Sequence, residues 1–266
     1  MKININVKKL KPKDLIVFDI DGTLTLTKSP MDEEMADLIA RLLIVKKVAI
    51  IGGAKFSLFK GQIKPLHVPE QLFKKLFLFP TTATSFYRYR SGWKNVYAFQ
   101  LSKTERQKTK KAFSQVLKEI GYKQPQKIYG KVIEDRGSQI TFSAMGQDVV
   151  AILGEKRGVA LKTKWVQENH DLKMKIAKLV GRLLPELEVR AAGFTSIDVT
   201  KKGIDKAYGL EQIKKYLKVD IKDMLFIGDA IFPGGNDYAV VRTGIDYIPV
   251  TGPTETKKII RDILKS

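Results

Sequence analysis

Short apolar runs alternate with stretches of helical periodicity over the first eighty residues. Unbroken runs of four or five apolar residues are typical of strands buried on both faces of a parallel sheet. Such runs stand at residues 15–18, 47–51 and 76–80, and helical spacing occupies 31–43 and, around two prolines, 56–75. The β-α-β-α-β order predicts an α/β core with a doubly wound, Rossmann-like parallel sheet.

The pattern changes after residue 83. Residues 85–101 alternate as a hairpin does, and a basic helix with Ser102 and Glu105 in capping-box positions follows over 102–120. Further short strands are predicted at 128–134, 139–143, 188–192 and 195–200, with a helix at 168–184. This mixture predicts a separate α+β unit inserted into the core.

The core pattern then returns as helix, strand, helix, strand, helix. The predicted ranges are 206–216, 224–227, 238–243, 247–250 and 254–264. We therefore predict three segments: core residues 1–83, an inserted domain at 84–199, and core residues 200–266.

Composition removes several kinds of chemistry. The chain of 266 residues has no cysteine, which excludes disulfides, thiolate metal sites and a cysteine nucleophile. Its two histidines exclude a multi-histidine metal site. Residues 1–7 lack the apolar run of a signal peptide, and no run reaches the length of a membrane span. A cytoplasmic protein without a membrane partner is the expectation.

The formal charge of +20 is the unusual bulk property. A basic chain can bind nucleic acid or attract anionic substrates. The lysines are spread along the whole chain, and many fall on predicted helices, where they read as solvated faces. Nucleic-acid binding is therefore kept as an alternative and is not expected as the main role.

Two acids stand where the first predicted strand ends. Asp19 and Asp21 are one residue apart, and Gly22 breaks the strand. Ligands of open α/β sheets bind beyond the carboxyl ends of the strands, where two carboxylates can hold a divalent metal while one attacks phosphorus. An ordinary strand-ending turn is the alternative, because Asp and Gly favour turns.

This stretch, continued by Thr23-Leu24-Thr25, resembles the signature of the haloacid dehalogenase (HAD) superfamily of phosphoryl-transfer enzymes. Within it the chain resembles the HAD-IIB group, above all the eukaryotic-type phosphomannomutases and their bacterial relatives. The sharpest match is the run from Gly228 to Asp237, supported by Gly52-Gly53 and by Gly203-Ile204-Asp205-Lys206. The resemblance implies a HAD core with a cap of the C2b type inserted after the third strand.

The resemblance also assigns roles at the strand ends. Asp19 would be the nucleophile that forms an aspartyl phosphate, and Asp21 would be the general acid and base. Mg²⁺ would lie between Asp19, the main-chain carbonyl of Asp21, and Asp229, with Asp237 and Asn236 supporting that shell.

Lys206 would bring a fixed positive charge to Asp19 and the phosphoryl group. A plain surface lysine is the alternative for Lys206, and an N-terminal helix cap is the alternative for Asp237.

The second strand end departs from the superfamily pattern. Ala54 stands where the superfamily has Ser or Thr, so phosphate binding would rest on the backbone N–H groups of Gly53 and Ala54. Losing one such donor can cost on the order of 10²–10³ in rate. Lys28 also stands where the family has an arginine in the first loop.

The inserted domain keeps part of the family's sugar-phosphate site. Arg136 and Ser143 keep their places, whereas Gln147 stands where a second arginine is expected. Ser196 and Asp198 match residues that hydrogen-bond sugar hydroxyls. Polar residues on the solvent face of a strand remain the alternative for Ser143, Gln147 and Ser196.

Three functions stay open from the sequence. The first is a phosphomannomutase-like, Mg²⁺-dependent isomerase that interconverts mannose 1-phosphate and mannose 6-phosphate, with a hexose 1,6-bisphosphate as activator. The second is a sugar-phosphate phosphatase, a hydrolase with water as acceptor. The third is a basic nucleic-acid- or ligand-binding protein without turnover. Relatives of this kind are often dimers, which makes a homodimer one expectation.

Overall fold

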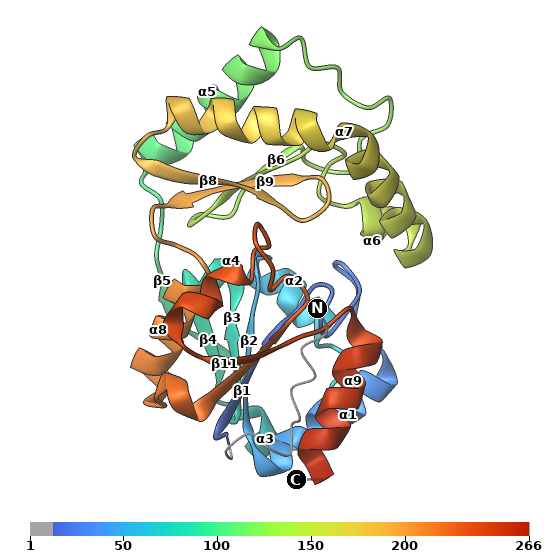
Figure 1. Ribbon diagram of the computed structural model, residues 1–266, viewed down its shortest axis with the longest axis vertical. Coiled ribbons are helices and arrows are strands. Elements are labelled where there is room, and N and C mark those ends of the chain that lie inside the picture. Colours follow the sequence, from blue (N-terminus) through green and yellow to red (C-terminus); the bar gives the residue numbers. More distant parts are fainter. Residues whose placement is uncertain (1–12, 266) are drawn as a thin grey trace. The chain divides into compact units, whose positions relative to one another are not determined.

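The computed structural model describes residues 13–265, and the chain divides into two compact units. The first unit combines the residues up to Ala98 with those from Asp205 onward, and the second is Phe99–Ile204 (Figure 1). The parts of the predicted segments that fall on residues 1–12 and 266 lie outside the described residues.

A seven-stranded sheet forms the centre of the first unit. Its order is β11-β10-β1-β2-β3-β4-β5, with parallel pairing from β11 through β3 and antiparallel pairing beyond. The strands are β1 Leu15–Asp19, β2 Lys47–Ile51, β3 Leu76–Phe79, β4 Ser85–Tyr89, β5 Trp93–Ala98, β10 Met224–Gly228 and β11 Asp246–Pro249. The predicted parallel core is confirmed.

Helices cover both faces of this sheet, because the strand side chains alternate between two apolar clusters. Ile16 and Phe18 pack on the side of α1 and α9, whereas Leu15 and Val17 pack on the side of α8 (Figure 1). The helical segments are α1 Glu33–Val45, α2 Phe56–Gln62, α3 Glu70–Phe73, α4 Pro80–Ala83, α8 Lys206–Leu217, η2 Ile221–Asp223, η3 Tyr238–Thr243 and α9 Pro253–Lys265.

The order of the strands reverses between β1 and β10. From β1 the chain proceeds to β2 and β3 on one side, and the later strands β10 and β11 lie on the other side. In open α/β sheets the ligand crevice forms at such a switch point, beyond the carboxyl ends of the strands. The fold therefore brings the residues after β1 and β10 to the expected place for a site.

The hairpin β4–β5 belongs to the core sheet and not to the inserted unit. The predicted boundary at residue 83 falls before this hairpin, whereas the first compact unit continues to Ala98. Strand β4 pairs antiparallel with β3, and Phe86 stacks on Phe79 with ring centroids 4.4 Å apart. The change from parallel to antiparallel pairing alters the sequence pattern without ending the domain. The second boundary likewise lies at Ile204, beyond the predicted residue 199.

The second unit is a four-stranded sheet with helices packed on one face (Figure 1). Its elements are α5 Lys103–Glu119, β6 Ile133–Asp135, β7 Ile140–Ser143, α6 Val149–Leu153, α7 Glu155–Leu183, β8 Leu187–Ala192 and β9 Ser196–Lys201. The strands follow the order β6-β7-β9-β8 and pair antiparallel throughout. The predicted capping box is present, since Ser102 and Glu105 each accept the other's backbone N–H.

Two predicted elements of this unit were wrong in extent. The strand expected at 128–134 is reduced to Ile133–Asp135, because the preceding residues bond irregularly to the turn after β7. Helix α7 begins at Glu155, well before the predicted residue 168. It departs from helical geometry at Asn169, whose side chain donates to the carbonyl of Trp165 at 2.9 Å. The predicted helix corresponds to the half after this kink.

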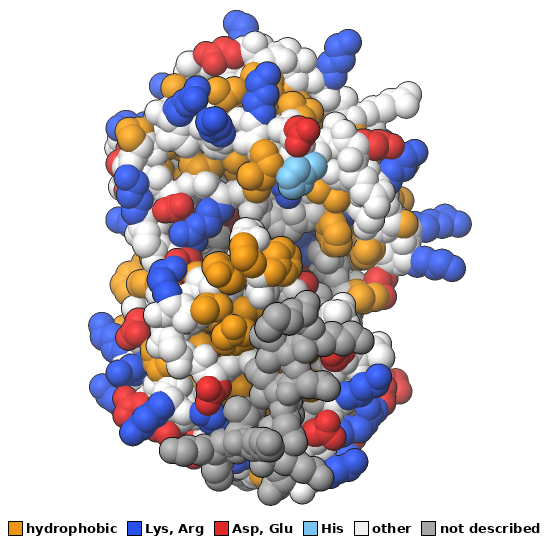
Figure 2. Space-filling model, viewed as in Figure 1, with side chains coloured by type: hydrophobic (Ala, Val, Ile, Leu, Met, Phe, Trp, Pro, Cys, Tyr) orange, Lys and Arg blue, Asp and Glu red, His pale blue; other side chains and the backbone are white. Residues whose placement is uncertain are grey.

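Two bulk expectations can be compared with the structure. Figure 2 shows lysine and arginine side chains scattered over the visible face and not gathered in one patch. Within residues 13–265, no helix has the length and apolar character needed to cross a bilayer.

A left-handed turn follows β3 directly. Thr81, Thr82 and Ala83 all have positive φ, between 50° and 59°. This conformation costs an L-residue about 1–2 kcal/mol. The turn is held because the N–H groups of Thr81 and Thr82 donate to the carbonyls of Ala54 and Gly52, at 2.9 and 2.8 Å. The strained turn thus fixes the loop that follows β2.

Thr82→Gly is expected to stabilise the protein by about 1 kcal/mol, which raises the Tm by about 2–4 °C in a chain of this size. Glycine adopts positive φ freely, and the backbone N–H that bonds Gly52 is retained. Thermal denaturation followed by circular dichroism measures the change. Thr81→Gly is the control, because it also removes a hydroxyl that accepts from Thr84 at 2.7 Å. A smaller gain is expected for Thr81→Gly, and no gain in Thr82→Gly would contradict strain relief at Thr82.

Candidate active site

Asp19 is the last residue of β1 and lies buried, with 3% of its surface exposed. Its strand pairs with β2 on one side and with β10 on the other, so the strand end is fixed from both sides. Asp229 directly follows the last residue of β10. The two carboxylates are therefore neighbours in space although 210 positions separate them in the chain (229 − 19).

Lys206 is placed by the start of helix α8. Asp205 caps this helix by accepting the N–H of Tyr208 at 3.0 Å, and Arg242 holds the same carboxylate at 2.6 Å. Lys206 is the first helical residue, and its ammonium donates to the carboxylates of Asp19 and Asp237, the latter at 2.5 Å. The lysine side chain is 3% exposed, which excludes the surface-lysine alternative.

Asp237 is fully buried and belongs to the same cluster. One of its carboxylate oxygens accepts from Lys206, and the other accepts the N–H of Ala230 at 3.2 Å. Asp237 stands at the N-cap position of helix η3, but its side chain makes no capping hydrogen bond there and contacts Lys206 and Ala230 instead. The neighbouring Asn236 is exposed, and its predicted supporting role stays a prediction.

The electrostatics of this cluster leave negative charge in excess. Burial raises the pKa of Asp19 well above its ordinary value, opposed by Lys206 and reinforced by Asp237 and Asp229. Burial and the Asp237 charge raise the pKa of Asp229 to about 6. Burial opposes the charge of Lys206, but the pKa of Lys206 is nevertheless raised by Asp19 and Asp237. One ammonium thus serves three buried or half-buried carboxylates.

A divalent cation fits this arrangement. Carboxylate oxygens of Asp19, Asp229 and Asp237 lie within 4.8 Å of one another, and oxygens are the ligands that Mg²⁺ prefers. Gly22, at φ 88°, passes so close to Asp229 that a Cβ there would overlap its carboxylate. The glycine therefore keeps room for Asp229 beside the loop that carries Asp21. A cation would balance the charge that raises the pKa values of these acids.

Asp21 lies half-buried in the loop after β1 and outside this carboxylate cluster. Its Oδ1 accepts the backbone N–H of Lys28 at 2.7 Å and the side-chain amide of Gln62 at 2.8 Å. Lys28 thus contacts the predicted acid through its backbone. Gln62 was missed by the sequence reasoning, although a polar residue between the apolar Phe59 and Ile63 on one helix face was a usable signal.

The loop after β2 contains Gly53 and Ala54, whose predicted role as backbone donors to phosphate stays a prediction. The carbonyl of Gly52 points to Thr82, on the β3 side. Because the C=O and N–H of one peptide point in opposite directions, the N–H of Gly53 points away from Thr82. Ala54 is buried, and its carbonyl is occupied by Thr81.

Comparison with known proteins identifies the family. The family model described as "Eukaryotic phosphomannomutase" matches residues 35–266, which is most of the chain. This chain belongs to the phosphomannomutase family. The phosphomannomutase of Saccharomyces cerevisiae is 26% identical over 96% of both chains. Phosphomannomutase 1 of Dictyostelium discoideum is 27% identical over 96% of this chain and 98% of its own.

Solved structures share the fold. An IMP-bound, N-terminally truncated IMP-nucleotidase of Plasmodium falciparum has a TM-score of 0.70 and 17% identity, covering 98% of this chain and 70% of its own. A haloacid dehalogenase-like hydrolase of Bacteroides thetaiotaomicron has a TM-score of 0.59 and 13% identity, and the match covers 94% of this chain and 99% of the hydrolase. The HAD fold inferred from the Asp19–Asp21 motif is confirmed. Family and fold together make this phosphomannomutase-family chain an enzyme of the HAD phosphotransferase type.

In the second unit the residues predicted to bind the sugar, Ser196 and Asp198, fall on one sheet face. Alternation places Ile197 and Val199 in the core, and Ser196 and Asp198 on the opposite face. Asp198 accepts the hydroxyl of Thr141 across the strand pair at 2.7 Å. Ser196 and Asp198 are half-buried, so both remain suited to binding.

Ser143 differs from its neighbours on that face. It is 1% exposed, and its hydroxyl donates to the carbonyl of Gly146 at 2.8 Å. A hydroxyl held in this way stabilises the turn after β7. Its predicted role as a substrate contact stays a prediction, and the turn contact explains the residue without it.

Arg136 and Gln147 lie together at the edge of this sheet. The guanidinium donates to Glu134 at 2.8 Å and to the amide oxygen of Gln147 at 3.1 Å. The Arg136 side chain is 7% exposed, so this ion pair is largely desolvated. Gln147 therefore contacts the arginine at the place where a second arginine was expected. The positive charge available to a phosphate is reduced by Glu134.

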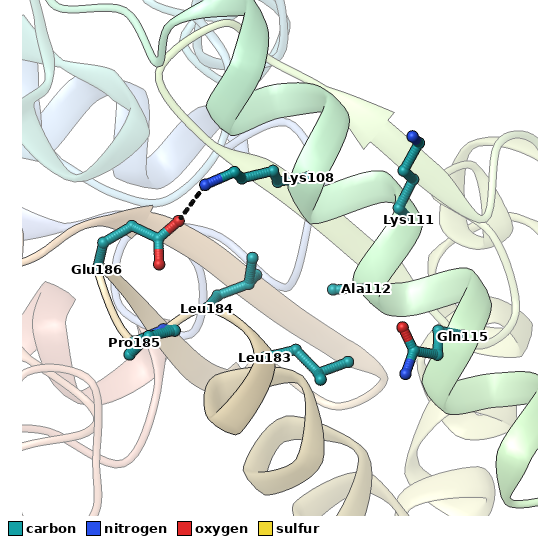
Figure 3. Close-up of a pocket in the computed structure, with 8 residues that line it drawn as sticks. All are labelled: Lys108, Lys111, Ala112, Gln115, Leu183, Leu184, Pro185 and Glu186. Carbon is teal, nitrogen blue, oxygen red and sulfur yellow. Dashed lines mark hydrogen bonds and ion pairs between the residues drawn. The ribbon is translucent and has the colours of Figure 1, made fainter.

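A hollow of about 440 Å³ also lies in the second unit, between α5 and the turn before β8 (Figure 3). Leu183, Leu184 and Pro185 line it together with α5 residues, and Lys108 pairs with Glu186 at 3.5 Å. None of its lining residues was predicted as a site residue. The hollow does not change the assignment of the site.

Proposed function

We propose that this protein transfers a phosphoryl group on a hexose phosphate, interconverting mannose 1-phosphate and mannose 6-phosphate. One observation carries the proposal: the buried cluster of Asp19, Lys206, Asp229 and Asp237 at the ends of β1 and β10. Family membership supplies the substrate class.

The reaction proceeds in two displacements. A carboxylate oxygen of Asp19 attacks one phosphorus of a hexose 1,6-bisphosphate, the bond from that phosphorus to the sugar oxygen breaks, and Asp21 gives that oxygen its proton. In the other displacement a hydroxyl of a hexose monophosphate attacks the aspartyl phosphate, Asp21 takes the hydroxyl proton, Asp19 leaves, and the bisphosphate forms. The protons balance because Asp21 gives one and regains one.

Lys206 has two tasks in this scheme. Its ammonium, held between Asp19 and Asp237, keeps the nucleophile oriented and lowers the cost of its negative charge. It also brings positive charge close to the phosphoryl oxygens. The Gly53 N–H, which points away from Thr82, is proposed as a backbone donor to the same oxygens.

Asp19, Asp229 and the main-chain carbonyl of Asp21 are proposed to hold Mg²⁺, with Asp237 and Asn236 behind them. The three clustered carboxylates and the raised pKa of Asp229 support this assignment. Bound Mg²⁺ supplies positive charge that offsets repulsion between the phosphate and the carboxylates.

The second unit is proposed to bind the rest of the sugar phosphate. Ser196 and Asp198 present half-buried polar groups suited to sugar hydroxyls, and Arg136 suits a phosphate. Lys28 is proposed as a further phosphate contact through its side chain. The homodimer expected from the resemblance stays a prediction.

Hydrolysis is the second candidate function. Gln147 replaces an expected arginine, and Glu134 already neutralises Arg136 at 2.8 Å. A weak clamp for a second phosphate would let the intermediate sugar bisphosphate escape. Water would then accept the phosphoryl group, with Asp21 removing its proton.

³¹P NMR separates these reactions. The protein is incubated with Mg²⁺ and mannose 1-phosphate, with and without a hexose 1,6-bisphosphate to phosphorylate Asp19. Conversion to the 6-phosphate only with the bisphosphate is the expected result. Growth of inorganic phosphate alone would establish the hydrolase instead. A parallel sample stripped with EDTA is expected to be inactive, and undiminished turnover there would contradict the metal assignment.

A further inference from the structure

Gln62 is a buried polar residue at the end of α2, with 1% of its surface exposed. Its side chain lies beside Asp21 although 41 positions separate the two in the chain. The amide nitrogen donates to Asp21 Oδ1 at 2.8 Å and to Thr25 Oγ1 at 3.1 Å. Both contacts lie in the loop that follows the nucleophile strand.

The orientation of the amide is fixed by what it faces. A carboxylate accepts hydrogen bonds only, so the nitrogen of Gln62 must point toward Asp21. Turning the amide around would place its oxygen against the carboxylate. Oδ1 of Asp21 therefore accepts two hydrogen bonds, one from Gln62 and one from the backbone N–H of Lys28 at 2.7 Å. The described residues place no hydrogen bond on Oδ2, which leaves that oxygen for proton exchange.

Gln62 is anchored well enough to impose this orientation. Its backbone carbonyl accepts the N–H of Met31 at 2.9 Å, and Phe59, one turn earlier in the same helix, is fully buried. The position is costly, because the amide oxygen Oε1 is buried without a partner among the described residues. An apolar side chain would avoid that cost. The glutamine therefore points to function and not to packing.

We propose that Gln62 is a positioning residue that holds Asp21 in the orientation for proton transfer. The proposal rests on the proposed function, in which Asp21 protonates the leaving oxygen and then deprotonates the acceptor. Proton transfer depends steeply on placement, and misplacing a reacting group by about 1 Å can cost 10²-fold. Gln62 fixes one carboxylate oxygen and so aims the other.

Gln62→Met is the principal variant, because methionine keeps the length of the side chain and removes both the donor and the acceptor of the amide. We expect kcat on the sugar phosphate to fall by about 10–100-fold with KM within threefold of the wild type. Gln62→Leu is the second variant, since an aliphatic side chain has no donor for Asp21. Gln212→Met is the matched control, because Gln212 on α8 also buries an unpartnered amide oxygen. It should leave kcat unchanged.

A second substrate separates positioning from general damage. 4-Nitrophenyl phosphate has a good leaving group that needs no proton, so forming the aspartyl phosphate does not require Asp21. Gln62→Met should release a rapid, stoichiometric burst of 4-nitrophenolate at a rate within threefold of wild type. Steady turnover should then be slow, because deprotonating the acceptor still requires Asp21. A structural defect would lower the burst as well.

The outcomes distinguish the two proposals. A folded Gln62→Met with kcat within threefold of wild type, or an equal loss in burst and steady turnover, would overturn the positioning role. If methionine prevents folding, Gln62→Leu decides by the same criteria. If the wild type turns over neither substrate, or if Asp21→Asn keeps full activity, the proposed function fails instead.

Discussion

Asp19→Asn is expected to reduce turnover of mannose 1-phosphate by about 10⁴-fold or more. The carboxylate is the proposed nucleophile, and a neutral amide of the same shape cannot form the aspartyl phosphate. Lys206 keeps its contact with Asp237, so the fold around the site is retained. Coupled assays give the rate, and rapid quenching with ³²P-labelled substrate tests for phosphorylated protein, which should be absent.

Asp14→Asn is the matched control for this variant. Asp14 precedes the same strand and is exposed, so its replacement removes the same charge without touching the buried cluster. Turnover should be unchanged. If Asp19→Asn kept more than a hundredth of wild-type turnover, or still became phosphorylated, another residue would be the nucleophile.

Lys206→Met is expected to have the largest effect on stability. Removing one partner from a buried ion pair costs about 3–5 kcal/mol, since the remaining charges are left uncompensated. Here Asp19 and Asp237 would both lose the buried ammonium. A loss of this size lowers the Tm by about 10 °C. Turnover should also fall by about 10²–10³-fold, because the phosphoryl charge loses a fixed donor.

Lys215→Met provides the comparison on the same helix. Lys215 is exposed, so removing its charge should change the free energy of unfolding by no more than about 0.5 kcal/mol. Urea denaturation of the two variants and the wild type measures the difference. A loss below about 1 kcal/mol for Lys206→Met would show that the lysine contributes little to the fold and would leave it only a catalytic role.

In the proposed scheme, the choice between mutase and hydrolase depends on how strongly the second unit binds a second phosphate. Arg136 is largely desolvated and already paired with Glu134. A buried arginine exchanges its carboxylate partner only for a group that offers equal or better hydrogen bonds, as a dianionic phosphate does. With Arg136 as the proposed phosphate clamp, the mutase reaction requires phosphate to displace Glu134, whereas hydrolysis does not.

The local pattern of apolar and polar residues was sufficient to predict an element wherever its contacts follow from residues close by in the chain. The four apolar residues before Asp19 predicted a strand buried on both faces, and the structure has that strand at Leu15–Asp19. The capping box at Ser102 and Glu105 was equally local, because both partners lie within one helical turn. The pattern was insufficient at the β4–β5 hairpin, since alternation does not reveal which sheet a strand joins.

The sequence by itself determined the chemistry available at each strand end. Acids at Asp19, Asp21 and Asp229 could be identified as candidates because strand ends are visible in the apolar pattern, whereas Asp237 was a candidate only through the family resemblance. Only the tertiary structure decided which of them meet. Placing β10 beside β1 brings Asp229 to Asp19, and the start of α8 inserts Lys206 between Asp19 and Asp237. Gln62 reaches Asp21 in the same way. Periodicity records which face of an element is buried, whereas these contacts depend on the order of strands in the sheet.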